Sequence, residues 1–302
     1  MKRSLHVGLL VMSFLVMLNP MVFGGARLLT VSLAEGDFQR VQDAIDAAED
    51  GGVIVIRPGT YRENLTIDRP LTLLGREGVF LEPADAERPA MTVDRTKTVT
   101  IQGLRIRMAA VAIDISRSSC TISDCSISAS HTGIRVMAFD DDAVSIFGTT
   151  FRSGSQGVGA LIAGSGTTLF AQCEFSGLGT ALLVVGAGTA VVQGCGLESC
   201  YEAVVASNTT HTVLIGNTIR GNYANGIRLD PVPSAADEGA LCLIDNEIED
   251  NDGWGLTLCG LHRAAVDAAF GRIAGSGNSF SGNGRGDVCP EDLPLPDGFI
   301  LP

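Results

Sequence analysis

Charged and aromatic side chains are scarce in this chain of 302 residues. Only 18% of the residues are charged and 5% are aromatic, whereas 45% are hydrophobic and 37 are glycines. The formal net charge of −13 argues against nucleic acid as a partner, because nucleic-acid binding needs a basic surface. It also provides no general attraction for anionic polymers, which would need a local basic patch or a bound cation.

Cysteine motifs for metal binding are also missing. The sequence has eight cysteines but no CxxC motif and no His/Cys pair at the spacing of a zinc site. Their number would permit disulfides in an oxidising compartment. Cys259 and Cys289 follow the third strands of neighbouring C-terminal repeats and are the candidate disulfide. Four others are expected to point inward as small apolar fillers: Cys120, Cys125, Cys173 and Cys195.

The long apolar run of the sequence lies at its N-terminus. Lys2 and Arg3 precede an apolar stretch from Val7 to Leu18, and small residues follow at positions 24–26. This arrangement predicts a cleavable secretory signal over residues 1–26, with an uncleaved membrane anchor as the alternative. Cleavage would remove two positive charges and change the net charge from −13 to −15. We therefore expect a secreted or periplasmic protein without a membrane span after cleavage.

A repeat of 21 to 32 residues occupies most of the remaining chain. Apolar residues alternate with polar ones, as in Val99, Ile101, Leu104 and Ile106, so one face of each short strand is predicted to be buried. Such a period is typical of a solenoid, in which equivalent residues of successive coils stack roughly 4.8 Å apart. The equivalent apolar anchors are Ile106, Ile127, Phe151, Phe175, Leu197, Ile219, Ile248 and Phe280.

Two further columns of the repeat are chemically restricted. The position two residues before the anchor is Asn217, Asn246 and Asn278 in the last three complete repeats, and we expect these side chains to hydrogen-bond along the axis. The position six or seven residues after the anchor is always glycine or alanine, as expected where the chain bends sharply. This small-residue column is Ala112, Gly133, Gly157, Ala181, Ala203, Gly226, Gly255 and Gly286.

The segment before the repeats has helical periodicity. Phe38, Val41, Ile45 and Ala48 recur at helical spacing within residues 37–51. A solenoid must cover the open end of its core, so we interpret this helix as the N-terminal cap. The predicted organisation is a signal peptide over 1–26, a capping segment and helix over 27–52, a β-helix over 53–290 and a C-terminal tail over 291–302.

Residues at the start of the repeats resemble a known group of proteins. Segments 38–48, 53–63 (with Gly59-x-Tyr61-x-Glu63) and 71–75 resemble the opening of right-handed parallel β-helix proteins, which include pectin methylesterases, pectate lyases and NosD-like periplasmic proteins. The later coils agree with this resemblance through residue 288. It implies an all-β fold, a single-stranded right-handed parallel β-helix (solenoid) with an N-terminal capping helix. It implies no particular activity, because members with different activities share this scaffold.

The catalytic motifs of pectin methylesterases and polygalacturonases are absent, whereas the carboxylates and the arginine of pectate lyases have no strict spacing to test. Neither the Asp-Phe-x-Phe-Gly motif of pectin methylesterases nor the Gly-His-Gly motif of polygalacturonases occurs. The best acidic cluster is Asp140, Asp141 and Asp142, which could hold Ca²⁺ or act in catalysis, or could form a solvated turn. Arg135 is predicted to stack one coil above Asp114, either as the basic partner of this loop or in a surface ion pair.

Several outward residues are candidates for contact with a sugar polymer. Tyr61 and Glu63 belong either to a site or to the scaffold, whereas Arg105, Arg152 and Arg228 could donate to sugar oxygens or lie on a solvated face. Candidates for stacking on sugar rings are Tyr61, Tyr201, Tyr223 and Trp254. His131, His211 and His262 lie in different parts of the repeat and do not predict a metal cluster.

An apolar stripe is predicted on the outer face of the first strands. Because such a stripe exceeds what monomers normally expose, we expect the insertions 232–239 and 259–275 or the tail 293–301 to cover it, with self-association as the alternative. The outward apolar residues are Phe147, Leu169, Ala171, Val191, Val213, Ile215 and Ile244.

The sequence supports three functional hypotheses, in decreasing order. The first is a non-catalytic scaffold that binds polysaccharide or a cell-surface component. The second is a carbohydrate-active lyase, esterase or epimerase with a diverged site near residues 140–142. The third is a NosD-like metal-maturation factor. The question of enzymatic activity stays open, and Ca²⁺ is the cofactor that the acidic loop suggests.

Overall fold

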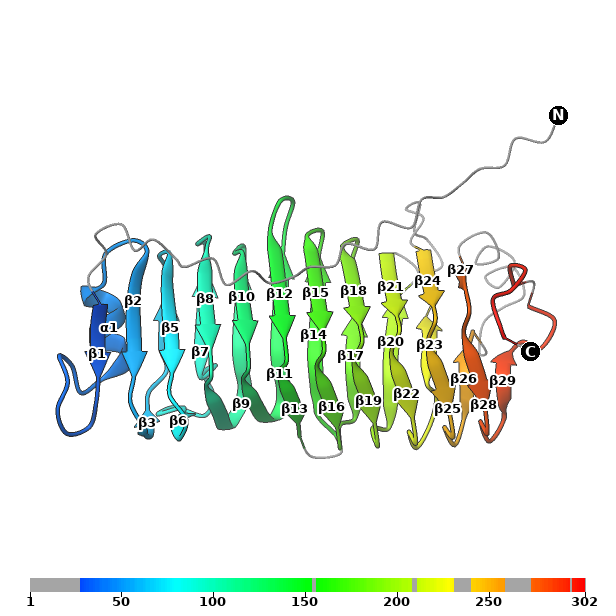
Figure 1. The fold of residues 1–302 in the computed structure, drawn as a ribbon, viewed down its shortest axis with the longest axis horizontal. Coiled ribbons are helices and arrows are strands. Elements are labelled where there is room, and N and C mark those ends of the chain that lie inside the picture. Colours follow the sequence, from blue (N-terminus) through cyan, green and yellow to red (C-terminus); the bar gives the residue numbers. More distant parts are fainter. Residues whose placement is uncertain are drawn as a thin grey trace.

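A computed structural model describes residues 28–153, 156–207, 211–230, 240–258, 273–293 and 295–301. The chain winds into an elongated parallel β-solenoid, with successive coils side by side along its length (Figure 1). Its first face is one parallel sheet of eleven strands. These are β1 (Leu28–Val31), β2 (Gly52–Ile56), β5 (Leu71–Gly75), β8 (Val99–Gln102), β10 (Cys120–Ser123), β12 (Ala143–Phe147), β15 (Thr167–Ala171), β18 (Thr189–Gln193), β21 (His211–Ile215), β24 (Ala240–Ile244) and β27 (Ile273–Ser276).

The other two faces form a second parallel sheet that continues around a corner of the coil. Strands β9 (Arg105–Ser116) and β11 (Ser126–Ala138) run through the corner and pair along both faces. The second face otherwise consists of β3 (Gly59–Arg62), β6 (Val79–Glu82), β13 (Thr150–Arg152), β16 (Glu174–Ser176), β19 (Gly196–Glu198), β22 (Thr218–Arg220), β25 (Glu247–Glu249) and β28 (Ser279–Ser281). The third consists of β4 (Leu65–Ile67), β7 (Met91–Asp94), β14 (Val158–Gly164), β17 (Thr180–Val184), β20 (Glu202–Ser207), β23 (Ile227–Asp230), β26 (Trp254–Thr257) and β29 (Gly286–Cys289).

The predicted anchor column is confirmed by the register of the second face. Ile127 pairs with Ile106 and Phe151, and the same column continues through every later coil to Phe280. The predicted small-residue column is wrong at two positions, Gly157 and Gly286. Ala160 pairs with Ile134, so Gly159 rather than Gly157 stands in this column, and Asp287 rather than Gly286 follows Gly255. The coil of Phe151 has a connection two residues longer than its neighbours, whereas in the last coil the position lies seven residues after the anchor, as in the two coils before it.

A column of buried acceptors links the coils, as the asparagine pattern predicted. Asn217 Nδ2 donates to Asn246 Oδ1 at 2.9 Å, and Asn246 Nδ2 donates to Asn278 Oδ1 at 2.9 Å. The same oxygens accept the backbone N–H of the preceding coil at 3.0 and 3.1 Å. Earlier in the column, the Thr149 hydroxyl accepts the Cys125 N–H in the same way. Each turn therefore satisfies buried backbone groups of its neighbour, which buried polar groups require.

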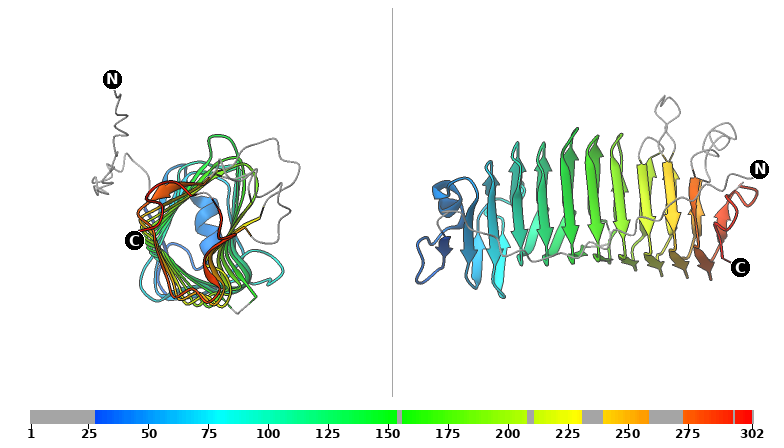
Figure 2. Two further views of the ribbon diagram at one scale, coloured as in Figure 1. Left: turned by 90° about the vertical axis from the view of Figure 1, so that its right-hand side faces the viewer. Right: turned by 45° about the horizontal axis from the view of Figure 1, so that its top comes forward.

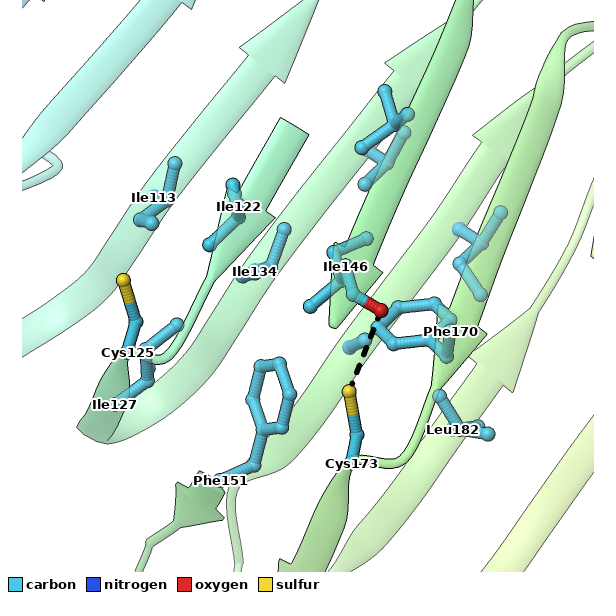
Figure 3. Packing of buried hydrophobic residues seen from close by; sticks show 14 of the residues in the cluster. Ile113, Ile122, Cys125, Ile127, Ile134, Ile146, Phe151, Phe170, Cys173 and Leu182 are labelled. Atoms are coloured by element: carbon cyan, nitrogen blue, oxygen red, sulfur yellow. Dashed lines mark hydrogen bonds between the residues drawn. The ribbon is translucent and has the colours of Figure 1, made fainter. Parts of the chain in front are cut away.

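The apolar core fills the inside of the solenoid. The rings of Phe151 and Phe175 stack with centroids 4.4 Å apart and planes 4° from parallel, and Phe170 packs edge-on against both. Figure 3 shows Cys173 beside the rings of Phe151 and Phe170, where its thiol donates to the carbonyl of Ile146 at 3.5 Å. The four cysteines predicted to point inward are buried and free. They therefore fill the core as small side chains, as expected.

Helix α1 (Val41–Ala47) closes the N-terminal end of the core. It lies across the end of the coil, inside the outline of the strands (Figure 2, left), and it buries Val41, Ala44 and Ile45. Residue 40 provides no side-chain cap; instead, the Glu63 carboxylate accepts the N–H groups of Val41 and Gln42 at 2.8 and 3.0 Å. Strand β1 precedes the helix and pairs with β2, so the first sheet begins inside the segment predicted to be only a cap.

The C-terminal tail closes the opposite end of the core. Phe299 is 1% exposed and its ring stacks with that of Phe280 at a centroid distance of 6.5 Å. The Phe299 carbonyl accepts the backbone N–H and the side-chain amide of Asn278 at 3.1 and 3.0 Å. The tail therefore covers the end of the solenoid and not the outer apolar stripe, which corrects one of the two covers predicted for that stripe.

The stripe itself is present on the first face. Leu169, Val191 and Val213 are neighbours in the sheet register, and the stripe residues are all half-buried. The insertion 232–239 and residues 259–272 of the second insertion lie outside the described residues. Self-association through this stripe therefore stays a prediction.

The predicted disulfide can be followed from one side only. Cys289, at the end of β29, is disulfide-bonded, whereas its predicted partner Cys259 lies outside the described residues.

Candidate functional site

A surface cavity lies at the turns between the second and third faces. It has a volume of about 780 Å³ and is lined by residues of four successive coils, at the turns that lead into β14, β17, β20 and β23. Tyr201 and Tyr223 stand beside it and are 59% and 65% exposed. We call this cavity the tyrosine groove. Its lining residues are Gln156, Gly177, Leu178, Gly179, Thr180, Ser199, Tyr201, Glu202 and Tyr223.

The two tyrosines owe their position to the buried residue that precedes each of them. The Cys200 N–H donates to Asn222 Oδ1 at 3.0 Å, and Asn222 Nδ2 donates to Asn251 Oδ1 at 2.7 Å. This second ladder holds the turns of successive coils in register, and the residue after each ladder position points outward. Tyr223 therefore lies one coil after Tyr201, at a spacing of roughly 4.8 Å along the axis. Exposed aromatic rings at such a spacing form an apolar platform with polar edges.

The floor of the tyrosine groove contains a carboxylate held by an arginine. Glu202 is 8% exposed and accepts two hydrogen bonds from Arg228, Nε to Oε1 at 2.8 Å and Nη2 to Oε2 at 2.9 Å. Asn225 Nδ2 donates to Glu202 Oε1 at 3.1 Å, and Arg228 also pairs with Asp230. The hydrogen bonds to Glu202 raise the pKa of Arg228. Arg228, a predicted binding residue, is thus bound to carboxylates and fixes the floor of the groove.

The acidic loop predicted as a calcium or catalytic site lies elsewhere. Asp140 and Asp141 are exposed, whereas Asp142 is 4% exposed, forms an ion pair with Lys97 and accepts the Phe139 N–H at 3.0 Å. Burial raises the pKa of Asp142, but the bonds from Lys97 and Phe139 outweigh burial and lower the pKa below its usual value. Asp142 therefore holds the loop in place, while all three aspartates line one pocket of about 490 Å³ together with Lys97 and Arg117. A calcium or catalytic role of this loop stays a prediction.

Arg135 is paired with Asp114, as the stacking predicted. Arg135 Nε and Nη2 donate to the two carboxylate oxygens at 2.8 and 2.6 Å. This hydrogen bonding raises the pKa of Arg135. The pair occupies the third face in register between β9 and β11, and no groove residue contacts it among those described. The structure therefore shows Arg135 in an ion pair with Asp114 and not as the basic partner of the acidic loop.

Tyr61 and Glu63 belong to the scaffold. Tyr61 is 2% exposed and its hydroxyl donates to the Arg57 carbonyl at 2.9 Å. Burial raises the pKa of Tyr61, with a smaller effect from Glu63. Glu63 caps helix α1, as described above. The Gly59-x-Tyr61-x-Glu63 motif therefore connects the first coils to the capping helix and does not form a binding surface.

The remaining predicted arginines, Arg105 and Arg152, lie on the second face and are not among the described residues that line the tyrosine groove. Arg105 lies over the ring of Phe80, with its guanidinium carbon 5.6 Å from the centroid. Next to it, the buried Glu82 accepts hydrogen bonds from Arg62 and Arg107, and these bonds lower the pKa of Glu82. Arg152 is exposed on β13, between serines in the register. The structure does not bring Arg105, Arg152 and Arg228 together.

Metal-binding clusters are absent from the part of the chain that the structure describes. Within it, no three His, Cys, Asp or Glu side chains are grouped so that they could hold a metal ion. His131 and His211 are exposed on different faces, and His262 lies outside the described residues. No described helix has the length and apolar character that a membrane span requires.

The sequence identified only part of this site. The sequence indicates Tyr201 and Tyr223 as candidates for sugar stacking. Their position one coil apart follows from the structure. Glu202, Ser199 and Thr180 were missed, since nothing in their local pattern separates them from other outward polar residues. A signal for the second ladder was present, because Asn222, Asn251 and Asn283 each follow an anchor by three residues.

The chain is similar to one curated protein over a limited length. It is 27% identical over 99 residues to a cell surface glycoprotein from Methanothermus fervidus. The alignment covers 32% of this chain and 16% of that protein, so the chain spans a small part of its relative.

Solved structures with the same fold have low sequence identity to this chain. ORF18 of Geobacillus virus E2 matches with a TM-score of 0.58 at 14% identity, over 82% of this chain and 55% of that chain. An alginate lyase from Paenibacillus sp. matches with a TM-score of 0.56 at 12% identity, over 91% and 99% of the two chains. The pectate lyase Pel9A matches with a TM-score of 0.53 at 13% identity, over 91% and 79%. These likenesses concern the fold.

The repeat region also matches a protein family over half of the chain. The family is described as "Right handed beta helix region", and the match covers residues 137–289. This range contains the anchor column from Phe151 to Phe280, both asparagine ladders and the tyrosine groove. The register described above, the resemblance of the first coils and this match agree, and the chain belongs to the right-handed β-helix family.

Proposed function

We propose that this chain is a secreted or periplasmic, non-catalytic module that binds a carbohydrate chain in the tyrosine groove. The observation that carries the proposal is the pair of exposed rings, Tyr201 and Tyr223, on successive coils above a cavity of about 780 Å³. Tyrosine is well suited to sugar recognition, because its ring packs on the C–H face of a pyranose while its hydroxyl bonds to sugar oxygens.

Among its described lining residues, the groove has no pair of groups that could act as acid and base. Its one carboxylate, Glu202, is held by Arg228 through two hydrogen bonds, so neither residue is available as a general base. Similarity to a cell surface glycoprotein and fold likeness to polysaccharide lyases support an extracellular role in contact with carbohydrate. Exposed Arg105 and Arg152 would then contact the polymer outside the groove.

Incubation of the purified protein with a panel of soluble and insoluble polysaccharides, with and without Ca²⁺, tests this proposal. We expect at least one polysaccharide to retain the protein, and we expect no new reducing ends, unsaturated ends, methanol or epimerised sugar. Release of any such product would contradict the non-catalytic role and favour the lyase, esterase or epimerase hypothesis. Retention that does not depend on Tyr201 and Tyr223 would contradict the assignment of the groove.

A further inference from the structure

The charges around the tyrosine groove carry information about its ligand. Among the described residues, no lysine or arginine lines the groove, and Glu202 is the one charged lining residue. An acidic sugar bound there would place its carboxylate against aromatic rings and neutral groups without a counter-charge. Taking an ionised group out of water without a partner is costly, so the groove disfavours uronates and sulfated sugars.

A cationic sugar gains little in the groove. Glu202 is already paired with Arg228, whose guanidinium occupies both carboxylate oxygens. Asp230, on the other side of Arg228, has a side chain that is 49% exposed and is therefore solvated. An ammonium group entering the groove would meet a carboxylate whose charge is largely offset, and it would lose hydration on the way.

One hydrogen-bond acceptor in the groove has capacity left. Glu202 Oε1 accepts from Arg228 Nε and Asn225 Nδ2, whereas Oε2 accepts only from Arg228 Nη2 among the described residues. A carboxylate oxygen has two lone pairs, so Oε2 can accept one more hydrogen. A sugar hydroxyl is a donor of suitable size and carries no charge. Ser199, Thr180 and Gln156 add neutral donors and acceptors around it.

We propose that the tyrosine groove selects neutral hexose or N-acetylhexosamine oligosaccharides, an inference that rests on the proposed function. The C–H faces of the sugar rings pack on Tyr201 and Tyr223, and one hydroxyl donates to Glu202 Oε2. Because the tyrosines lie one coil apart, the bound chain runs along the axis of the solenoid. Recognition then depends on ring contact and neutral hydrogen bonds and not on ion pairs.

Calorimetric titration with defined hexasaccharides tests this proposal. The neutral probes are cellohexaose, mannohexaose and chitohexaose; the charged probes are hexagalacturonate and the glucosamine hexamer. We expect a neutral probe to bind with a Kd that is unchanged when NaCl is raised tenfold, since screening affects only charged ligands. Tyr201→Ala and Tyr223→Ala should each weaken this binding about tenfold, whereas the matching Phe variants should stay within about threefold.

A matched control is Phe139→Ala, which removes an exposed aromatic ring on another part of the surface. It should leave binding unchanged, and circular dichroism should show that all variants are folded. Tighter, salt-sensitive binding of a charged probe that still depends on the tyrosines would overturn the preference for neutral sugars while keeping the groove as the site. No binding of any probe, or binding indifferent to both tyrosines, would overturn the groove assignment and the proposed function together.

Discussion

At the scale of single residues, burial decides what the cysteines can do. Desolvation raises the pKa of Cys120 to about 12 and that of Cys125 to about 11, so almost no thiolate forms at neutral pH. We expect iodoacetamide to modify half-buried Cys242 first and to leave Cys120 and Cys125 unmodified in the folded protein at pH 8. Mass spectrometry of digested samples checks this order, with guanidinium-unfolded protein as the control in which all three react.

Asp142 predicts a pH dependence at acid pH. Its pKa is lowered in the folded protein, so the unfolded chain takes up the proton first as the pH falls. Its contribution to stability is therefore fully present above its ordinary pKa of 3.8 and is lost as the pH falls through its lower folded value. The difference in unfolding free energy between wild type and Asp142→Asn, measured by urea unfolding, should shrink between pH 6 and pH 2. A constant difference would show that folding does not lower the pKa of Asp142.

At the scale of elements, the asparagine ladder holds the coils together through buried amides. Asn246 donates to Leu214 O and Asn278 Oδ1 and accepts from Asn217, so Asn246→Ala leaves several buried groups without partners. We expect a loss of about 3 kcal/mol in unfolding free energy. The control is Asn283→Ala at the half-buried end of the second ladder, where water can replace the lost bonds and the loss should be smaller. Equal losses would contradict this view of the ladder.

Helix α1 depends on a carboxylate that is distant in sequence. Because Glu63 accepts the N–H groups of Val41 and Gln42, Glu63→Ala should cost about 2 kcal/mol and loosen the cap. Hydrogen exchange is expected to speed up in residues 41–47 before it does in the central coils. Similar protection of α1 in the variant and the wild type would mean that apolar packing alone keeps the cap in place.

How far the sequence predicts these elements depends on whether a feature repeats. The anchors from Ile106 to Phe280 were correct because each is one of many equivalent apolar positions, and a single irregular coil cannot hide the period. Gly157 was misplaced because the turn before β14 is longer, and only pairing reveals that Gly159 stacks on Gly133. The tyrosine groove was not predicted because it depends on the conformation of four turns. Local patterns do not specify which side chains such turns bring together.

At the scale of the whole molecule, the fold is a stack of nearly equivalent units. Ser126 pairs with Arg105, so deletion of residues 105–125 removes one full circuit and rejoins the chain at an equivalent position. We expect this variant to fold with a cooperative thermal transition, a moderately lower Tm and an intact tyrosine groove. Deletion of residues 105–114 is the control; it removes a partial circuit, puts the anchors out of register and should prevent folding. Failure of both deletions would contradict the equivalence of the coils.

Closure of both ends limits how far the stacking of strands can extend. The edge of β1 is covered by its own return loop, since the Ser32 and Phe38 N–H groups bond to Phe38 and Thr30 carbonyls. At the other end, Leu301 and Gly298 bond to Asn278 and Gly277 and occupy the edge there. An uncovered parallel edge would template the addition of another chain and allow growth into a fibril. These contacts occupy part of the outer edge of the first sheet at both ends, where they oppose the end-to-end addition of another chain.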